Sequence, residues 1–362
     1  MLDVKESGVD IHLGDKCSKI AFEWAQKTFP NRRHRIGMPD TRLKGSYANV
    51  LDYGDLRLAI ASDGIGTKIE VAERTGIYNS LGFDLVSMVV DDLACIGAEP
   101  VNFSNILDVD YLDEKVVDSL MEGLYEASNV ASIAVTGGEI AELGSRISGY
   151  GSGMHFNWCA TGIGALAKNK NPIDGSTIKP GDSIIAIKSL GFRSNGFTMA
   201  RKILEAAFGD KWHEEISHSG IPWGQILLIP SLICSPAIMK LHAEDVDIHG
   251  TVHVTGGGIA GNLSRMLRKN KVGAELNNLF EPHSFMTELQ ELGNIDEEQV
   301  YELWNMGNAM LVIVESGDEE RALDIIRMNQ YQGRVAGVVT ADETIVLHSK
   351  SVKPTTLIYE VH

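Results

Sequence analysis

The sequence lacks several features that would place it in a familiar class. Its four cysteines, Cys17, Cys95, Cys159 and Cys234, lie far apart and form no CxxC pair. Such spacing is typical of reduced proteins and differs from that of disulfide scaffolds and zinc ribbons. No GxxxxGK[ST], HExxH or GxSxG motif occurs. These absences exclude a P-loop ATPase, a zincin protease and a hydrolase with a nucleophile elbow.

Basic clusters and long apolar runs are also missing. The chain has 32 Lys and Arg against 49 Asp and Glu, for a net charge of −17, and no run of five basic residues. Nucleic acid and anionic membranes are therefore poor candidates as partners. The first ten residues lack an apolar signal core, and the apolar stretch 221–234 is broken by Pro222 and Pro230. We expect a cytoplasmic protein with a small-molecule substrate, no nucleic acid partner and no membrane partner.

Length and local pattern predict two domains. A chain of 362 residues that is 44% hydrophobic can bury more than one core. The polar, turn-rich segment 168–180 suggests a division into 1–170 and 171–362. Helices are expected at 16–27, 81–97, 113–127, 197–208, 262–268, 297–304 and 319–328, with strands between them. We expect the first helix to turn Ile20, Ala21, Trp24 and Ala25 inward.

A glycine-containing corner, SDGIGTK, follows the strand that carries Leu56, Leu58 and Ile60. Gly64 and Gly66 would let the backbone approach a ligand closely. Amides at the start of the next helix, with Thr67 and Lys68, would face an anion such as a phosphate. Asp63 would hold a hard cation such as Mg²⁺. A turn that needs Asp and Gly only for its conformation is the alternative.

Further acids follow along the chain. Asp84, Asp91 and Asp92 lie on the polar side of the predicted helix 81–97, and we expect Asp84 to be solvated. Glu139 follows a predicted Gly-Gly turn at the end of a strand. Asp63, Asp92 and Glu139 together would form a three-carboxylate metal site at the ends of three elements.

Two turns in the second half resemble ligand-binding loops. Ser194, Asn195 and Gly196 begin a predicted helix, where they would equally serve as an ordinary cap. Residues 256–261 satisfy GxGxxG between a strand and a helix, and Glu275 follows about 20 residues on. This pattern favours an NAD-dependent oxidoreductase, although a phosphate cradle explains the same glycines. His253, beside this turn, is expected to pack within its strand.

Taken together, these stretches resemble the aminoimidazole ribonucleotide synthetase (phosphoribosylformylglycinamidine cyclo-ligase) family. The matching blocks appear in order over nearly the whole chain: SGVDI, SDGIGTK, DLVSMVVDDLACIGAEP, TGGEIAE, SNG, HVTGGG and NMG. The resemblance implies an α/β (α+β) synthetase fold of two domains. The first domain would contribute strands to a β-barrel across a homodimer, and the second would be an α/β domain that completes the active-site cleft.

The resemblance also implies the activity and the roles of residues. The reaction would convert formylglycinamidine ribonucleotide and ATP to aminoimidazole ribonucleotide, ADP and phosphate through an imidoyl phosphate, with Mg²⁺ required and K⁺ left open. Metal ligands would be Asp63, Asp92 and Glu139. Nucleotide contacts would be Gly64, Gly66, Thr67 and Lys68, and Lys68 would also neutralise charge during catalysis. Substrate contacts would be Ser194, Asn195, Gly196, Thr255, Gly256, Gly257 and Asn305.

Three positions depart from the family pattern. Residues 44–49 are poorer in glycine, Arg193 stands where the family usually has histidine, and Asp91 where it has asparagine. Arg193 cannot act as a base but would bind a phosphate or a departing oxyanion during catalysis. If it contacts only phosphate, Arg193→His should be tolerated. The departures keep a second hypothesis open, another ATP-using member of this fold with a different amide or phosphate acceptor. A non-catalytic nucleotide-binding relative is a third.

Overall fold

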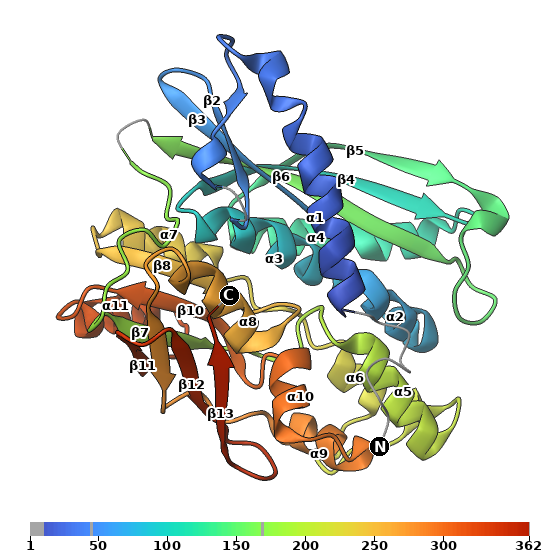
Figure 1. Cartoon of the computed structure of the whole chain (residues 1–362). Helices are drawn as coiled ribbons and strands as arrows, with labels where there is room; N and C mark the ends of the chain where they lie inside the picture. The colour runs from blue at the N-terminus through green and yellow to red at the C-terminus, as the bar shows by residue number, and fades with distance from the viewer. Residues whose placement is uncertain (1–10, 44–45, 168–169, 362) are drawn as a thin grey trace.

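Two β-sheets organise the computed structural model, which describes residues 11–43, 46–167 and 170–361 (Figure 1). The six-stranded sheet has the order β1-β2-β3-β6-β4-β5, and the seven-stranded sheet has the order β13-β12-β9-β11-β7-β10-β8. The strands of the first sheet all precede residue 168, and those of the second all follow residue 182. The predicted SGVDI block lies outside the described ranges except for Ile11. Residues 44–45 of the glycine-poor segment 44–49 and residues 168–169 of the predicted connection 168–180 lie outside them as well.

The first sheet is covered by helices on one face and open on the other. Its strands are β1 (Met38–Pro39), β2 (Asn49–Asp52), β3 (Leu56–Gly64), β4 (Glu99–Val109), β5 (Ala134–Glu142) and β6 (Phe156–Ala167). Phe103, Leu107 and Trp158 are fully buried on the face that packs on α3 (Leu81–Cys95), which itself packs on α4 (Glu114–Ala131). On β4, the side chains that alternate with these are exposed, and Ile106 is 52% exposed.

The central helix α3 confirms the predicted helix at 81–97. Its apolar residues Val86, Val89, Val90 and Leu93 are all fully buried. The helix ends just before Gly97, whose φ of +77° suits glycine. Besides the first sheet, α3 contacts β8 and α7 of the second half. It therefore lies at the junction of the two halves.

Helices pack against the second sheet, whose edge strand β13 stays partly exposed. Its strands are β7 (Ser183–Lys188), β8 (Ile248–His253), β9 (Gly273–Leu276), β10 (Asn308–Val314), β11 (Gly333–Thr340), β12 (Thr344–His348) and β13 (Thr356–Glu360). All residues of β8 and β10 are buried. The helices are α5 (Phe197–Phe208), α6 (Trp223–Leu227), α7 (Ser235–Ala243), α8 (Gly258–Leu267), α9 (Ser284–Gly293), α10 (Glu297–Leu303) and α11 (Glu319–Met328). In the described part of the chain, no helix combines the length and apolarity needed to cross a membrane.

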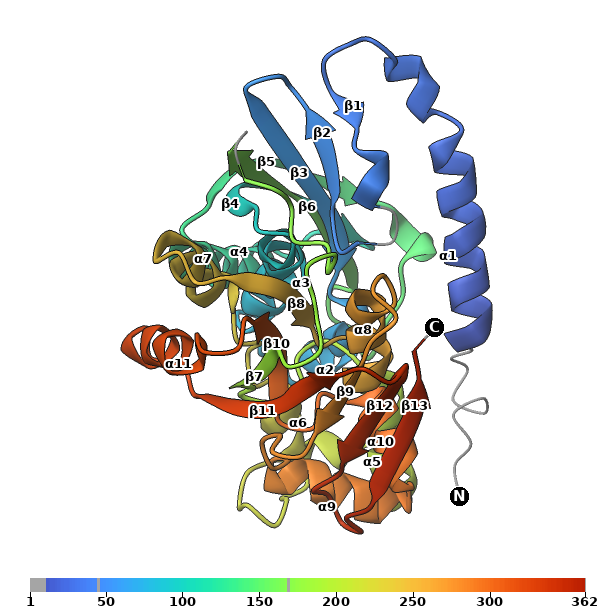
Figure 2. The same ribbon diagram turned by 60° about the vertical axis from the view of Figure 1, so that its left-hand side comes forward.

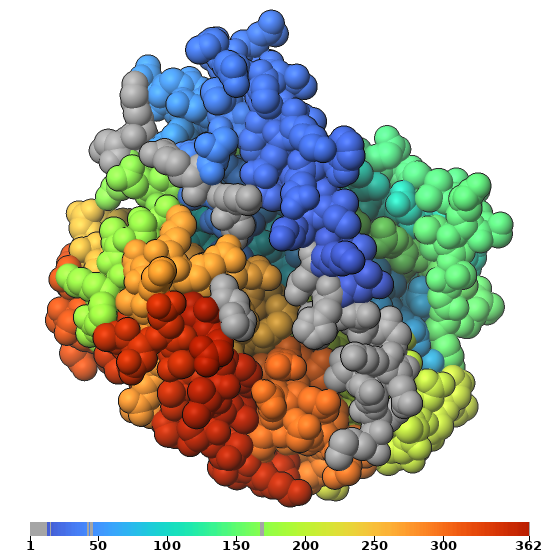
Figure 3. All heavy atoms as spheres, in the orientation of Figure 1, coloured from blue at the N-terminus to red at the C-terminus, as the bar shows by residue number. Residues whose placement is uncertain are grey.

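Two local predictions are wrong. The first helix, α1 (Ile11–Gln26), lies at the periphery, and Ile20 and Trp24 are 47% and 65% exposed rather than turned inward (Figures 2 and 3). The predicted Gly-Gly turn does not exist, because β5 continues through Gly137, Gly138 and Glu139. Gly138 is needed for close strand pairing instead: a Cβ there would lie 2.7 Å from the carbonyl oxygen of Asn105.

Candidate active site

The SDGIGTK corner links the first sheet to α2 (Ile69–Thr75). β3 extends through Asp63 and Gly64, and a short 3-10 helix, η4 (Gly66–Lys68), leads into α2. Gly66 has φ of +70°, a conformation that favours glycine. The Asp63 carboxylate accepts a hydrogen bond of 2.7 Å from the Gly64 amide. Thr67 Oγ1 lies 3.1 Å from Thr198 Oγ1, so the corner touches α5 of the second half.

Lys68 does not reach into this corner. Its side chain is fully buried, and Nζ lies 2.8 Å from Asp84 Oδ2 and 2.9 Å from the carbonyl oxygen of Ile229. The expectation that Asp84 is solvated is wrong: it is also fully buried and accepts a second bond from the Ser231 amide. Burial lowers the pKa of Lys68 and raises that of Asp84, while their mutual attraction opposes both shifts. This ion pair ties α3 to the 229–231 segment and occupies the Lys68 ammonium inside the protein.

Asp92 and Asp91 begin a chain of polar contacts that crosses between the halves. Asp92 Oδ1 lies 2.8 Å from His253 Nδ1, at the end of β8. His253 Nε2 lies 2.7 Å from Nη2 of Arg193, which also donates to Asp91 Oδ2 at 2.9 Å. The other oxygen of Asp91 accepts from the Cys234 and Ser235 amides at 2.9 and 2.7 Å. Arg193 and Asp91 are 1% and 0% exposed. Arg193 is therefore held in an internal ion pair with Asp91.

The contacts of His253 fix where its proton resides. A guanidinium only donates, so Nε2 of His253 must accept, and the ring proton sits on Nδ1. Nδ1–H then donates to Asp92. Burial, together with the charge of Arg193, lowers the pKa of His253 to about 3, consistent with this neutral form. Burial also raises the pKa of Asp92 to about 8, against the opposing influence of Arg265 and Arg193. His253 therefore orients the Asp92 carboxylate, a role beyond the strand packing expected for it.

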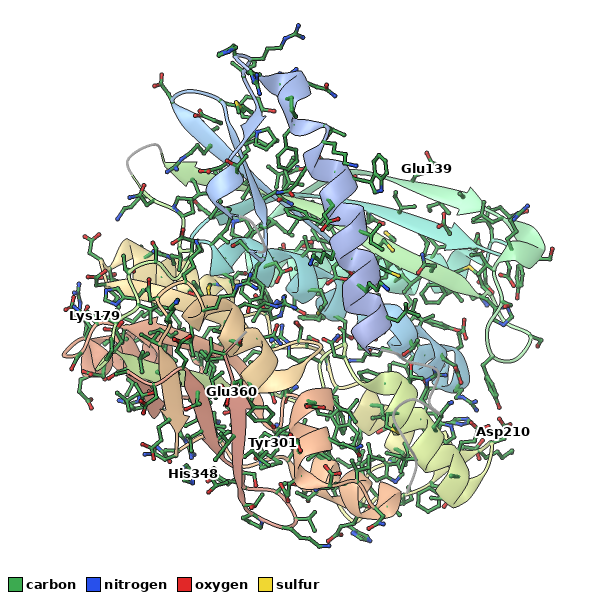
Figure 4. All side chains as sticks on the ribbon, viewed as in Figure 1. Glu139, Lys179, Asp210, Tyr301, His348 and Glu360 are labelled. Carbon is green, nitrogen blue, oxygen red and sulfur yellow. The ribbon has the colours of Figure 1, made fainter. Side chains whose placement is uncertain are left out.

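Asp63 and Asp92 lie in one neighbourhood, but Glu139 does not. The pKa of Asp63 is raised by desolvation, and the nearby Asp92 carboxylate raises it further. Glu139 is on β5, three strands from β3 in the sheet order, and points away from the molecule in Figure 4. With strands spaced about 4.8 Å apart, this separates it from Asp63 by roughly 14 Å. Within one chain the structure does not bring Glu139 into a site with the two aspartates.

The SNG turn lies against the TGGG turn. Nδ2 of Asn195 is 3.6 Å from the position of a Cβ at Gly256. Ser194 Oγ and Asn195 Oδ1 are buried and have no hydrogen-bond partner within the described chain. Such orphaned oxygens are costly unless a ligand or water meets them. They are the best candidates among the predicted substrate contacts.

Other predicted substrate residues shape the turns. Gly196 has φ of +78°, and a Cβ there would lie 2.4 Å from the Trp304 ring. Asn305 is 4% exposed, and its side chain accepts from Gly307 N at 2.9 Å and donates to Gly191 O at 2.8 Å. The Thr255 carbonyl oxygen accepts from the Gly258 amide. Asn305 therefore fixes the turn at 189–196.

Gly258, the last residue of the TGGG turn, and Gly261, one turn further along α8, have different roles that a pair of variants would distinguish. A Cβ at Gly258, where φ is +65°, would lie 1.8 Å from the Tyr301 carbonyl oxygen, whereas one at Gly261 meets nothing within 4 Å. Gly258→Ala should lower the free energy of unfolding by more than about 2 kcal/mol. Gly261→Ala, inside α8, should raise it by about 0.5–1 kcal/mol. Denaturant titration of both proteins measures the difference, and equal values would contradict this assignment.

The dinucleotide-binding alternative is wrong. A Rossmann unit needs the strands before and after its helix to be parallel in one sheet. Here β8 is an edge strand antiparallel to β10, and β9 lies four positions away, antiparallel to β11. The GxGxxG match therefore arises from a turn of another architecture.

The ion pair of Arg193 with Asp91 was not predicted, although the sequence carried a signal for it. Both residues depart from the family pattern, one by gaining a positive charge and the other by gaining a negative charge. Paired departures of opposite sign suggest direct contact. Arg265, which acts on Asp92, and Tyr47, whose ring lies 5.9 Å from the Arg265 guanidinium, carried no comparable signal.

Comparison with known proteins adds to this geometry. Residues 45–164 match the family described as AIR synthase related protein, N-terminal domain, and residues 179–350 match the corresponding C-terminal domain. The phosphoribosylformylglycinamidine cyclo-ligase of Thermococcus kodakarensis is 35% identical over 353 residues, which covers 98% of this chain and 100% of that protein.

Solved structures share the fold at low identity. A chain of the HypE-HypF complex aligns with a TM-score of 0.62 and 18% identity, covering 93% of this chain and 99% of that one. T. maritima PurL complexed with ADP aligns with a TM-score of 0.57 and 14% identity, covering 87% of this chain and 45% of that one. These structural similarities establish the synthetase fold alone.

Proposed function

Because this chain belongs to the AIR synthase related family, we propose that it is an ATP-dependent cyclo-ligase that converts formylglycinamidine ribonucleotide to aminoimidazole ribonucleotide, ADP and phosphate in purine biosynthesis. The observation that carries the proposal is the relationship to a cyclo-ligase that extends over 98% of this chain and 100% of that protein. The convergence of Asp63 and Asp92 with the SNG and TGGG turns at the junction of the halves is consistent with it. We take the two sheets to mark the domains 1–170 and 171–362.

The residues present fit a magnesium nucleotide. Asp63 and Asp92 are hard oxygen donors; burial raises the pKa of both, and the charge of Asp92 raises that of Asp63 further, a cost that a divalent cation would relieve. Mg²⁺ held there would neutralise charge on the transferred phosphoryl group. Gly64, Gly66 and Thr67 form the corner that the nucleotide would approach, and Gly256 and Gly257 form the facing turn. K⁺ is an additional cation to vary in the assay.

The chain's own part in catalysis is chiefly positioning. Phosphoryl transfer asks a protein to orient its reactants and to neutralise charge rather than to supply a nucleophile. His253 holds Asp92 through Nδ1–H, and the Arg193–Asp91 pair holds His253. Ser194 Oγ and Asn195 Oδ1 would bind polar groups of the substrate, and oriented contacts of this kind favour ring closure.

A cytoplasmic homodimer completes the proposal. The open face of the first sheet exposes Ile106 on β4 and Leu56 on β3, at 52% and 43%. A second copy of the chain that packed its own open sheet there would cover these apolar side chains. Such an arrangement corresponds to the dimeric β-barrel implied by the family resemblance.

Light scattering would test the dimer. We expect a particle of twice the 39.4 kDa chain mass, and Ile106→Glu should shift it towards the monomer because a charge on an apolar interface is costly. Tyr125→Glu, on the exposed surface of α4, is the matched control and should leave the mass unchanged. A monomeric wild-type protein would overturn this part of the proposal.

ADP release tests the activity itself. Purified protein would be incubated with Mg·ATP, with and without formylglycinamidine ribonucleotide. Substrate-dependent ADP with stoichiometric aminoimidazole ribonucleotide is the expected result. ATP hydrolysis that ignores this substrate would favour another ATP-using member of the fold, and NADH binding without ATP dependence would overturn both.

The second candidate function, that of another ATP-using member of this fold with a different amide or phosphate acceptor, was suggested by the sequence and is less favoured by the structure. Arg193 and Asp91 suggested a different acceptor because both depart from the family pattern. Since the two side chains neutralise each other at 2.9 Å, neither presents a new charge to the substrate. The departures therefore need no change of substrate to explain them.

A further inference from the structure

Three potential metal ligands gather at the end of β8 opposite His253. They are Asp247, directly before β8, His249, within it, and Glu315, directly after β10. One ligand atom from each residue lies within 4.8 Å of the other two. His249 and His253 are four residues apart on one strand, so this cluster is roughly 13 Å from the Asp92 contact. Lys179, labelled in Figure 4, marks this side of the molecule, well away from Glu139.

The sheet itself brings these residues together. β8 and β10 are antiparallel neighbours, with Val314 opposite Ile248. The Glu315 amide donates to the Asp247 carbonyl oxygen at 3.1 Å, which continues the ladder by one step. Asp247 and His249 are two residues apart and therefore project from the same face of the strand.

His249 has the arrangement of a metal-binding histidine. Its residue surface is 6% exposed, and Nδ1 lies 2.6 Å from Oδ2 of the fully buried Asp182. A proton on Nδ1 shared with that carboxylate leaves the Nε2 lone pair free. Nε2 lies 3.6 Å from Asp247 Oδ2 and 4.0 Å from Glu315 Oε2, both beyond hydrogen-bond distance. A neutral imidazole in this position would turn its lone pair to two anionic oxygens, an arrangement that a cation between them would stabilise. The carboxylate–histidine–metal triad has this pattern.

The excess of negative charge around His249 also favours a bound cation. Asp182, Asp247 and Glu315 provide three carboxylates here. Asp318 adds a fourth, whose Oδ2 accepts a hydrogen bond of 3.0 Å from the Asp247 amide. Among the described residues, Lys179 is the ammonium that contacts this group, with Nζ 2.5 Å from Oε1 of Glu315; the other oxygen, Oε2, is the one nearer His249. The carboxylates therefore outnumber the ammonium, and Glu315 Oε2 remains available as a ligand.

From this arrangement we propose that Asp247, His249 and Glu315 bind a first-row transition-metal dication of the Zn²⁺ class. One imidazole nitrogen and two carboxylate oxygens suit such an ion better than Mg²⁺, which prefers oxygen ligands alone. Metal–ligand bonds of about 2.0–2.2 Å require the ligand atoms to move closer together. The Asp247 and Glu315 side chains are 64% and 42% exposed and are free to rotate inward. The metal would fasten the edge strand β8 to β10 and, through Asp182, to the start of β7.

Titration of the full chain with ZnCl₂ in excess Mg²⁺ tests the proposal. The Mg²⁺ occupies hard carboxylate sites, so the expected result is one bound Zn²⁺ per chain and a rise in Tm of about 3–6 °C at saturating metal. His249→Gln, Asp247→Asn and Glu315→Gln should each weaken binding at least tenfold. The last two alter exposed side chains, so they remain informative if His249→Gln does not fold.

Matched variants locate the bound metal. His348→Gln alters another histidine–carboxylate pair, 3.4 Å from Glu275, and should leave Zn²⁺ affinity unchanged. Asp63→Asn should also retain the bound Zn²⁺, which separates this site from the catalytic one. Lys179→Ala should tighten binding severalfold because it removes a competing cation. Absence of stoichiometric Zn²⁺ binding, or binding that survives Asp247→Asn and Glu315→Gln, would overturn the assignment whatever the outcome of the ADP assay.

Discussion

Asp63→Asn and Asp92→Asn should each lower substrate-dependent ADP release by about two to three orders of magnitude while leaving the fold intact. Each substitution removes one anionic ligand from the proposed magnesium nucleotide site, where charge neutralisation is the main catalytic requirement. Asparagine keeps the oxygen that accepts from the Gly64 amide in one case and from His253 Nδ1 in the other. Steady-state kinetics at several Mg²⁺ concentrations measure the effect.

The control for these variants is Asp118→Asn, which removes a carboxylate from the exposed surface of α4. It should keep full activity, and thermal unfolding should show all three proteins folded. Near-normal turnover in both Asp63→Asn and Asp92→Asn would remove the metal role of these residues. Loss of activity accompanied by unfolding would show instead that the carboxylates are structural.

Local patterns in the sequence predicted most elements because burial on one face determines them. The helices at 197–208 and 319–328 were predicted with the bounds that α5 and α11 have, and α3 was predicted to within two residues. The predictions failed where the same sequence pattern is compatible with more than one structure. Ile20 and Trp24 of α1 were assigned to a core, yet they are exposed in the single chain. Gly137 and Gly138 were assigned to a turn, although glycine also permits close strand pairing.

The candidate site was predicted as a set of residues but not as a geometry. Motif order placed Asp63, Asp92 and the SNG and TGGG turns in one neighbourhood, and the structure does the same. It could not reveal that Lys68 is committed to Asp84 inside the protein, because a buried ion pair depends on long-range packing. For the same reason, the distance of Glu139 from the two aspartates required the strand order of the sheet. Spacing along a chain does not indicate which carboxylates converge.

Arg193→His alone should lower the free energy of unfolding by about 3–5 kcal/mol, the reverse of the tolerance expected from sequence. It would leave the Asp91 carboxylate, which is fully buried, without its guanidinium partner. Asp91→Asn should cost a similar amount, because the buried Arg193 charge would lose its counter-ion. Both variants should also disturb His253, whose Nε2 accepts from Arg193. Urea unfolding of each protein measures these losses.

The double variant Arg193→His with Asp91→Asn restores the residues typical of the family at both positions. Because the charge is removed from both partners together, no uncompensated buried ion remains. The double variant should therefore be more stable than either single variant, with a coupling energy of about 2–3 kcal/mol. Its ADP release should recover with its stability if the pair only positions His253. Additive losses in the cycle would mean that the two departures arose independently. Recovered stability without recovered turnover would mean that the Arg193 charge itself acts in the reaction.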